Sequence, residues 1–492
     1  MNEPHENEGM PLALRVEELI ERAVARHPDK PAIIFGERCW TYAETLAELD
    51  RRAARLLEAG AAAGAVILTT APLSDDFLLT FLACCRAGLI YIPLATQTTP
   101  AELVALAERA GPTFVLTADG LAHPALPAYR ALPLALPGAP SAAARQAALA
   151  RSRSGGPAAL AFARPTSGTT RRLPKLALRA HRQLTARVDP SRWLWWYDPA
   201  RVYCLLSPDQ FYVADTCQIF ALGATLVQVI DTHPRRLEQT LLRHGVTDLW
   251  TVPAALHALA NLTTPAPAEL RLTTVRTASM RLPGELRDTI AARYGATVAQ
   301  QYSTTEAGVL IATARCGTPE GSVGTPLPGV AIRLVDEGGY DVPEGASGEI
   351  IAHSAAAMLG YLGEPEQTAA TLRNGWIWTG DLARRDPEGN YFLLGRRSHW
   401  INVGGAKVLP EEVEQVLEEH PAVREAAVTG AIDATRGEVV RALIVPYGEP
   451  PTTAELIRFC RARLAPHKVP RQFEFREQLP RSTALKILRR EL

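Results

Sequence analysis

The chain alternates short apolar runs with stretches of helical periodicity through its first half. The amphipathic stretches predict helices at residues 42–57 and 76–87. The apolar runs predict strands at residues 32–35, 65–68, 113–117, 158–162, 225–230 and 248–252. This strand–helix alternation is typical of a layered α/β protein.

The alternation is interrupted over residues 118–157, which are rich in proline, alanine and arginine. Prolines spread along this stretch prevent a long continuous helix. We expect a surface connection here with a short helix at residues 142–151.

After about residue 323 the chain becomes punctuated by glycine and rich in β-type segments. Strands are predicted at residues 330–335, 348–352 and 391–394. A second compact unit follows, with helices at 410–419 and 453–464 and strands at 425–429 and 439–445. We therefore predict a large α/β N-terminal domain, residues 1–396, with a β-rich subdomain, and a small α+β C-terminal domain, residues 397–492.

Composition narrows the class of protein. The 492 residues contain 52 Lys+Arg and 52 Asp+Glu, so the formal net charge is zero. A protein dedicated to nucleic acid or to an anionic membrane should be more basic, so neither partner is expected. Arg86 interrupts the most apolar stretch, and the first residues are acidic and polar without a secretory pattern. We expect a cytoplasmic protein without a membrane span. Seven scattered cysteines fit neither a disulfide framework nor a zinc cluster.

The sharpest chemical signal lies directly after the apolar run at 158–162. Four hydroxyls surround one glycine, and a lysine follows: Thr166, Ser167, Gly168, Thr169, Thr170 and Lys175. Backbone N–H groups, hydroxyls and an ammonium suit a polyphosphate, although the spacing is not that of a Walker loop. A solvated turn is the alternative if the segment stands alone.

Three later segments carry complementary groups. Tyr302, Thr305 and Glu306 offer an aromatic ring, a hydroxyl and a hard oxygen ligand suited to Mg²⁺. Asp381 and Arg396 offer a carboxylate and a guanidinium that suit a ribose or a phosphate. The basic tail, residues 480–492, contains Lys486. Each segment alone has an ordinary structural explanation, such as a strand end, a turn or a solvated helix face.

In this order and with these separations, the four segments resemble the ANL superfamily of adenylate-forming enzymes. This superfamily contains acyl- and aryl-CoA synthetases, stand-alone adenylation domains and luciferases. The resemblance runs from about Trp40 to the C-terminus and includes the stretches at residues 84–94, 360–368 and 401–414. The texture of these motifs is closest to that of the acyl-CoA and acyl-carrier-protein ligases.

The resemblance implies the following roles. The segment from Thr166 to Thr170 and Lys175 would hold the β- and γ-phosphates of ATP, and Glu306 would bind Mg²⁺. Tyr302 and Thr305 would contact adenosine and the α-phosphate. Asp381 and Arg396 would hold the ribose, and Lys486 would be the adenylation lysine. The small domain would be mobile about a hinge at Ser398, with His399 at a position where an acidic residue is frequent.

Several residues depart from the family pattern. Arg171-Arg172-Leu173 adds one residue to the phosphate loop, Leu176 replaces its final glycine, Ser303 replaces a glycine, and Leu485 replaces the glycine before Lys486. These changes lower the expected turnover and leave the expected fold unchanged.

The residues expected to line the substrate pocket are Asp209, Phe211, Ser279, Met280 and Gln301. Met280 stands in a region that is usually rich in glycine, so it should fill space and favour a short or narrow acid. Asp209 has two explanations, a partner for a substrate amine or an ordinary loop carboxylate.

The resemblance implies ATP- and Mg²⁺-dependent adenylation of a small carboxylic acid, followed by transfer to CoA or to phosphopantetheine on a separate acyl or peptidyl carrier protein. Three alternatives stay open. The chain could be a stand-alone enzyme that activates an amino acid, an adenylate former with a non-thiol acceptor, or a nucleotide-binding homologue with impaired turnover.

Overall fold

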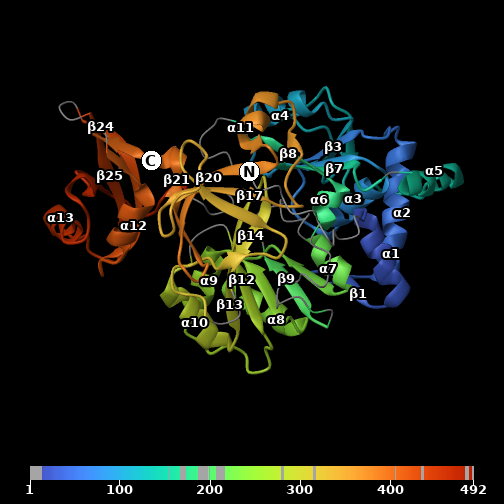
Figure 1. Cartoon of the computed structure of the whole chain (residues 1–492). Helices are drawn as coiled ribbons and strands as arrows, with labels where there is room; N and C mark the ends of the chain where they lie inside the picture. Colours follow the sequence, from blue (N-terminus) through green and yellow to red (C-terminus); the bar gives the residue numbers. More distant parts are fainter. Residues whose placement is uncertain are drawn as a thin grey trace.

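The computed structural model describes most of the chain. The described residues are 14–154, 156–166, 173–186, 198, 200–206, 216–278, 282–313, 317–404, 406–433, 437–481, 487–489 and 492. Figure 1 shows a large body that contains the N-terminal and middle parts of the chain, and a smaller unit beyond β20 and β21 that contains the C-terminal part.

The first sheet has the strand order β18-β8-β7-β4-β3-β5-β6. Its strands are β3 (Val66–Thr69), β4 (Ile90–Pro93), β5 (Phe114–Thr117), β6 (Ala131–Pro133), β7 (Leu160–Pro165), β8 (Leu176–Ala180) and β18 (Gly360–Tyr361). The part from β7 to β6 is parallel, whereas β8 pairs antiparallel with both β7 and β18. Successive side chains along a strand point to opposite faces of the sheet, so the apolar residues of these strands lie on both faces.

Helices cover both faces of this sheet. Ile67, Tyr91 and Phe114 pack on the side of α2 (Tyr42–Glu58), α3 (Asp75–Arg86) and α5 (Ala142–Ser154). Leu68 and Ile92 pack on the opposite side with α4 (Pro100–Ala110). Buried parallel strands of this kind are expected to be apolar on both faces.

The second sheet has the order β15-β14-β13-β12-β11-β9-β10-β1-β2. Its strands are β1 (Pro31–Phe35), β2 (Arg38–Thr41), β9 (Val202–Leu206), β10 (Thr225–Val229), β11 (Asp248–Thr251), β12 (Thr274–Thr277), β13 (Thr297–Thr304), β14 (Gly308–Ala312) and β15 (Thr325–Pro326). One face packs against α8 (Pro234–Arg243), α9 (Pro253–Ala260) and α10 (Gly284–Tyr294). The other face shares a core with the first sheet through α1 (Val16–Arg26), α6 (His181–Thr185) and α7 (Cys217–Leu222).

An antiparallel sheet forms the β-rich part predicted after residue 323. It contains β16 (Ala331–Val335), β17 (Gly348–His353), β19 (Leu372–Arg373), β20 (Trp376–Arg385) and β21 (Tyr391–Arg396), and α11 (Pro365–Thr371) precedes β19. β21 ends at Arg396, and a short 3₁₀ turn at Arg397–His399 leads into the C-terminal unit.

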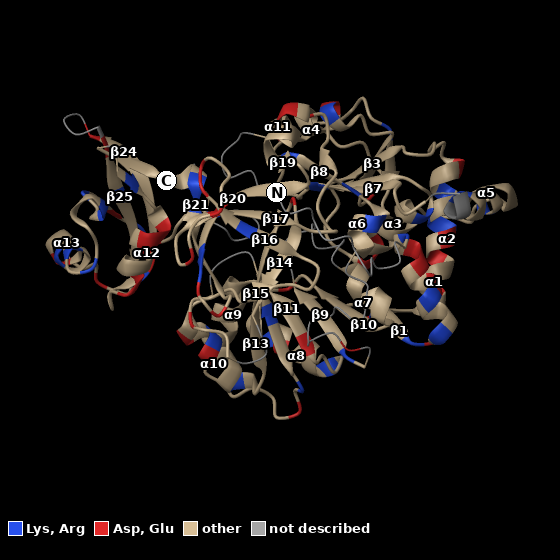
Figure 2. Cartoon of the chain, viewed as in Figure 1, with Lys and Arg blue, Asp and Glu red and all other residues tan. Residues whose placement is uncertain are grey.

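The C-terminal unit is a small α+β structure. Its elements are the hairpin β22 (Ile401–Val403) and β23 (Ala406–Val408), the sheet of β24 (Val423–Asp433), β25 (Gly437–Pro446) and β26 (Gln472–Phe475), and helices α12 (Pro410–Glu418) and α13 (Thr453–Arg461). Figure 2 shows acidic residues along α12. They pair with basic groups around that helix: Glu411 with His399 at 2.8 Å, Glu412 with Lys468 at 2.6 Å, and Glu414 with Arg489 at 2.8 Å.

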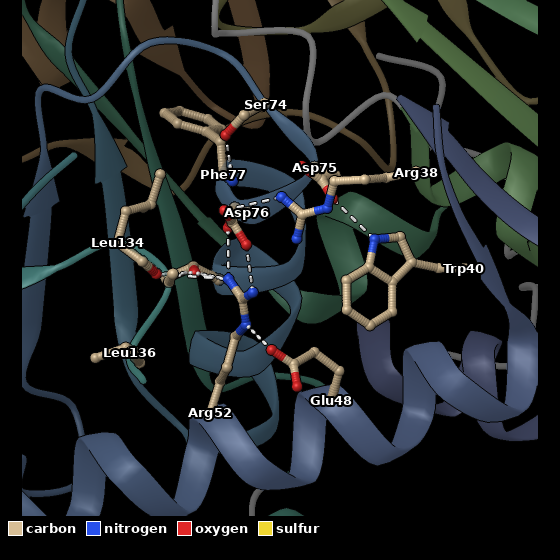
Figure 3. A network of polar contacts seen from close by, with 12 residues as sticks. Arg38, Trp40, Glu48, Arg52, Ser74, Asp75, Asp76, Phe77, Leu134 and Leu136 are labelled. Atoms are coloured by element: carbon tan, nitrogen blue, oxygen red, sulfur yellow. Dashed lines mark hydrogen bonds and ion pairs between the residues drawn. The ribbon is translucent and has the colours of Figure 1, made fainter. Parts of the chain in front are cut away.

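A buried arginine fastens α2 to the start of α3 (Figure 3). The guanidinium of Arg52, with a side chain 2% exposed, pairs with Glu48 at 2.6 Å and with Asp76 at 2.5 Å. It also donates to Thr80 Oγ1 at 2.9 Å. Nearby, the indole of Trp40 donates to Asp75 at 2.8 Å. Asp75 and Asp76 lie in the first turn of α3, where the helix dipole favours negative charge.

Most predicted elements are present, and several limits differ. β7 begins two residues later than predicted and continues to Pro165. β24 extends well beyond the predicted 425–429, and β6 lies inside the predicted surface connection. β6 is an edge strand, which can accommodate Pro133 because one side needs no ladder hydrogen bond. Among the described residues, none of the helices is long and apolar enough to cross a membrane.

Candidate active site

The two residues predicted to hold a ribose, Asp381 and Arg396, lie in one cluster with Tyr302. Asp381 on β20 faces Arg396 on β21 in the strand register. Its Oδ1 accepts from Arg396 Nε at 2.6 Å, and its Oδ2 accepts from the phenol of Tyr302 at 2.7 Å. Tyr302 comes from β13, which belongs to the second sheet. One carboxylate therefore joins two layers of the molecule.

The backbone around Asp381 is held by a second carboxylate. Gly380 adopts a left-handed φ of +74° and donates its N–H to Glu349 Oε1 at 3.0 Å. The hydroxyl of Thr379 accepts from the N–H of Asp381 at 3.1 Å. Because glycine adopts a positive φ without steric cost, this turn lets the strand present Asp381 toward Tyr302.

The charges in this cluster stabilise one another. The Asp381 carboxylate raises the pKa of Arg396 above its ordinary value. Burial, with Asp381 as a smaller cause, raises the pKa of Tyr302. The phenol of Tyr302 therefore stays protonated at neutral pH and donates a hydrogen bond to the Asp381 carboxylate.

The predicted metal ligand lies in a second cluster. Glu306 Oε1 accepts from the phenol of Tyr361 at 2.6 Å. The ammonium of Lys175 lies 4.0 Å from the centroid of the same ring. Thr166 and Lys175 close the stem of the predicted phosphate loop, since Thr166 N donates to Lys175 O at 2.8 Å and Lys175 N donates to Thr166 Oγ1 at 3.1 Å.

The two clusters are neighbours. The charge of Glu306 contributes to the raised pKa of Arg396, although less than Asp381 does. Next to Glu306 in the chain, the carbonyl of Thr305 accepts from Arg179 on β8 at 2.7 Å. A carboxylate, a phenol, an ammonium and a guanidinium thus surround one junction of the three sheets. A hard oxygen ligand beside an ammonium and a loop hydroxyl fits a divalent cation bound to a polyphosphate.

The remaining predicted residues divide into two groups. Gln301 is buried on β13 beside Tyr302, and Ser398 lies in the turn between the two parts of the chain. The others lie outside the described residues: Ser167, Gly168, Thr169, Thr170, Arg171, Asp209, Phe211, Ser279, Met280 and Lys486.

The structure describes the chain that leads to Lys486 as far as Arg481. Arg481 pairs with Glu425 at 2.7 Å. Both charges act on His257 of α9, whose pKa is lowered mainly by burial, with Arg481 lowering it further and Glu425 opposing it. The start of the basic tail therefore lies near a helix of the large body.

Sequence reasoning missed two residues that shape the site. Tyr361 binds Glu306, and Glu349 holds the turn before Asp381. Tyr361 lies inside the stretch at residues 360–368 that supports the resemblance, but a tyrosine after a glycine does not indicate its partner. Glu349 gave no signal, because a strand glutamate is usually exposed whereas this residue is 3% exposed.

Comparisons with known proteins agree with this arrangement. The model of the AMP-binding enzyme family matches residues 20–362, and the model of the AMP-binding enzyme C-terminal domain matches residues 412–486. The fold and the match define the class, an AMP-forming, adenylate-forming ligase. The chain belongs to the AMP-binding enzyme family, as the motif resemblance predicted, and the predicted α/β fold class is confirmed.

Individual relatives cover nearly the whole chain. The fatty acid–[acyl-carrier-protein] ligase ScoC of Streptomyces coeruleorubidus is 32% identical over 95% of this chain and 94% of its own. An indoleacetate–CoA ligase of Aromatoleum aromaticum is 29% identical over 96% of each chain. The structure of o-succinylbenzoate coenzyme A synthetase MenE from Bacillus subtilis, in complex with ATP and magnesium ion, superposes with a TM-score of 0.85 at 25% identity and covers 96% of this chain and 98% of its own.

Proposed function

We propose that the protein adenylates a small carboxylic acid with ATP and Mg²⁺ and then transfers the acyl group to the thiol of CoA or of phosphopantetheine on a separate carrier protein. The convergence of the Asp381 and Glu306 clusters at one junction, in a chain of this family, carries the proposal. Relatives that ligate acids to CoA and to an acyl carrier protein support both acceptors.

In the first step, a carboxylate oxygen of the acid attacks the α-phosphorus of ATP. The bond from that phosphorus to the bridging oxygen breaks, and pyrophosphate leaves. Two anions must approach each other, so the site has to supply positive charge where the transition state forms. Lys175 would bind the terminal phosphates, and Lys486 would supply charge at the reacting phosphorus.

The nucleotide would be oriented by the Asp381 cluster. The carboxylate suits the paired hydroxyls of a ribose, and the hydrogen bond from Arg396 fixes its direction. Glu306 would ligate Mg²⁺, which neutralises phosphate charge when bound. In the second step the thiol sulfur attacks the acyl carbon, the bond to AMP breaks, and the thiol proton is released.

The mechanism is tested by pyrophosphate exchange with a panel of short, aromatic and long-chain acids. Lys486→Ala should abolish exchange with the preferred acid. Lys468→Ala is a matched control, because Lys468 pairs with Glu412 inside the C-terminal unit. Equal exchange in Lys486→Ala and the parent protein would remove the assigned mechanism.

The acceptor is tested separately. The parent protein is given the preferred acid and ATP with CoA, with a phosphopantetheinylated carrier protein, or with neither, and the products are identified by mass spectrometry. A thioester with one thiol identifies the acceptor. Adenylate that accumulates with both thiols present would instead favour a non-thiol acceptor.

A further inference from the structure

A buried tyrosine lies between the two charged groups assigned to metal and phosphate. Tyr361 is 4% exposed. Its hydroxyl donates to Glu306 Oε1 at 2.6 Å, while the ammonium of Lys175 lies 4.0 Å from the ring centroid. One rigid side chain therefore acts on an anion through its polar tip and on a cation through its ring face.

The backbone fixes this arrangement on several sides. Tyr361 on β18 pairs with Ala177 on β8, the strand that begins directly after Lys175. The N–H of Tyr361 donates to Thr368 Oγ1 at 2.9 Å. The carbonyl of Glu306 accepts from Met358 N at 2.7 Å, just before β18. The segments that carry the three side chains are thus hydrogen-bonded to one another.

A salt bridge not foreseen from the sequence supports the same loop stem. Arg109 on α4 pairs with Glu364 at 2.5 Å and donates to the carbonyl of Pro174 at 3.3 Å. Pro174 precedes Lys175, and Glu364 follows Tyr361 by one turn. The ammonium and the ring are therefore restrained from both sides.

The geometry suits a donor role. The Tyr361 hydroxyl donates to Oε1 of Glu306, which leaves Oε2 of the same carboxylate to face a metal. A hydrogen bond from such an outer partner typically fixes the direction in which a ligand faces a metal.

We propose that Tyr361 is a positioning residue that couples the binding of a divalent cation at Glu306 to the binding of the ATP phosphates at Lys175. The proposal rests on the roles proposed above for Glu306 and Lys175. Because one side chain orients both groups, the gain in ATP affinity that Mg²⁺ produces depends on the Tyr361 hydroxyl.

The test measures ATP binding by calorimetry without any acid, once with Mg²⁺ and once with EDTA. Tyr361→Phe keeps the ring over Lys175 and removes the donor to Glu306. We expect the Mg²⁺-dependent gain in ATP affinity to fall about tenfold, with the affinity in EDTA unchanged. Tyr361→Leu also removes the ring, and its affinity in EDTA should fall by about threefold as well.

Two controls separate positioning from a general structural effect. Tyr340→Phe changes an exposed tyrosine and should alter neither titration. In Tyr361→Phe, the two titrations are compared within the same protein, so a loss of folded fraction reduces both and leaves their ratio intact. An equal loss of ATP affinity with Mg²⁺ and with EDTA would show that Tyr361 acts structurally, which overturns the proposal.

A Glu306→Gln variant distinguishes the two levels of inference. It should abolish the Mg²⁺-dependent gain, and adding Tyr361→Phe should then change nothing further. If Glu306→Gln keeps the full gain, the metal assignment of the proposed function fails, and the coupling through Tyr361 fails with it. If the gain is lost in Glu306→Gln but intact in Tyr361→Phe, only the proposal for Tyr361 fails.

Discussion

At the scale of single residues, Asp381 has to satisfy two donors at once. Its two oxygens accept from Tyr302 and Arg396, which come from different sheets. A side chain of the same shape without the charge would leave Arg396 without its anionic partner. The roles of these residues in nucleotide binding stay predictions, and Asp381 is where they are most directly tested.

Asp381→Asn should weaken ATP binding by about tenfold, because a hydrogen bond to a charged group contributes more than a neutral one. Calorimetry with Mg·ATP measures the loss. Asp341→Asn is the control, since Asp341 is an exposed carboxylate paired with Arg333. Parent-like affinity in Asp381→Asn would contradict the proposed ribose contact.

Glu17 on α1 is a second charged residue in an unusual setting. It is fully buried on α1, pairs with Arg15 at 2.6 Å, and lies 3.6 Å from His181. Burial raises the pKa of Glu17 from 4.5 to about 7 and lowers that of His181 to about 4. Between pH 4.5 and 7 the folded protein holds the Glu17 proton more tightly than the unfolded chain, so this carboxyl costs stability as the pH rises.

Glu17→Gln should therefore gain stability relative to the parent protein as the pH increases from 5 to 8. The full difference corresponds to about 3 kcal/mol for a shift of this size in a buried group. His181, with a folded-state pKa of about 4, stays neutral in the folded protein from pH 5 to 8, and its titration in the unfolded chain is common to both proteins. Thermal midpoints measured at several pH values give the result, and a difference independent of pH would refute the assigned cause.

At the scale of elements, the Arg52 network holds α2 against α3. Replacing Arg52 by Met would remove the buried cation that Glu48 and Asp76 share, while Glu48 keeps its pair with Arg51 and Asp76 its pair with Arg38. We expect Arg52→Met to lose about 1.5 to 3 kcal/mol of unfolding free energy, the usual contribution of hydrogen bonds between charged groups.

Arg55→Ala is the matched control on the same helix. Arg55 forms a more exposed pair with Glu58, whose loss should cost less than about 1 kcal/mol. Urea denaturation of both variants gives the comparison. Similar losses in the two variants would show that burial does not set the strength of the Arg52 network.

The elements also show what the sequence could predict. The start of α2 was predictable because Thr41 and Glu44 form a capping box. The strands of the parallel sheets were predictable because their apolar runs and periodicity are strong in the sequence. Motif order predicted Tyr302, Asp381 and Arg396, and the structure brings them together. Tyr361 and Glu349 could not be assigned, because their partners lie tens of residues away and only strand pairing brings them close.

At the scale of the whole molecule, the short segment at Arg397–His399 connects two units with separate cores. Arg397 pairs with Glu349 of the large body at 2.9 Å, while His399 pairs with Glu411 of the C-terminal unit. Ser398 stands between these two contacts, which suits the predicted hinge. Rotation of a unit about such a segment requires free backbone dihedrals at a few residues.

Ser398→Pro should restrict that rotation, because proline fixes φ near −65°. If the two half-reactions need different domain arrangements, the variant should keep adenylation at the parent rate and slow thioester formation by at least about tenfold. Pyrophosphate exchange measures the first and thioester yield the second. Ser398→Ala is the control and should support both steps; unchanged transfer in Ser398→Pro would argue against a hinge at this residue.

Adjacent arginines connect the Asp381 cluster to this segment. Arg396 pairs with Asp381, and its neighbour Arg397 pairs with Glu349, which also holds the turn before Asp381. Trypsin cleaves after arginine and requires a locally extended, accessible chain. We expect a nucleotide bound at Asp381 to steady both peptide bonds, so fewer proteolytic fragments ending at residue 396 or 397 would report that the site is filled.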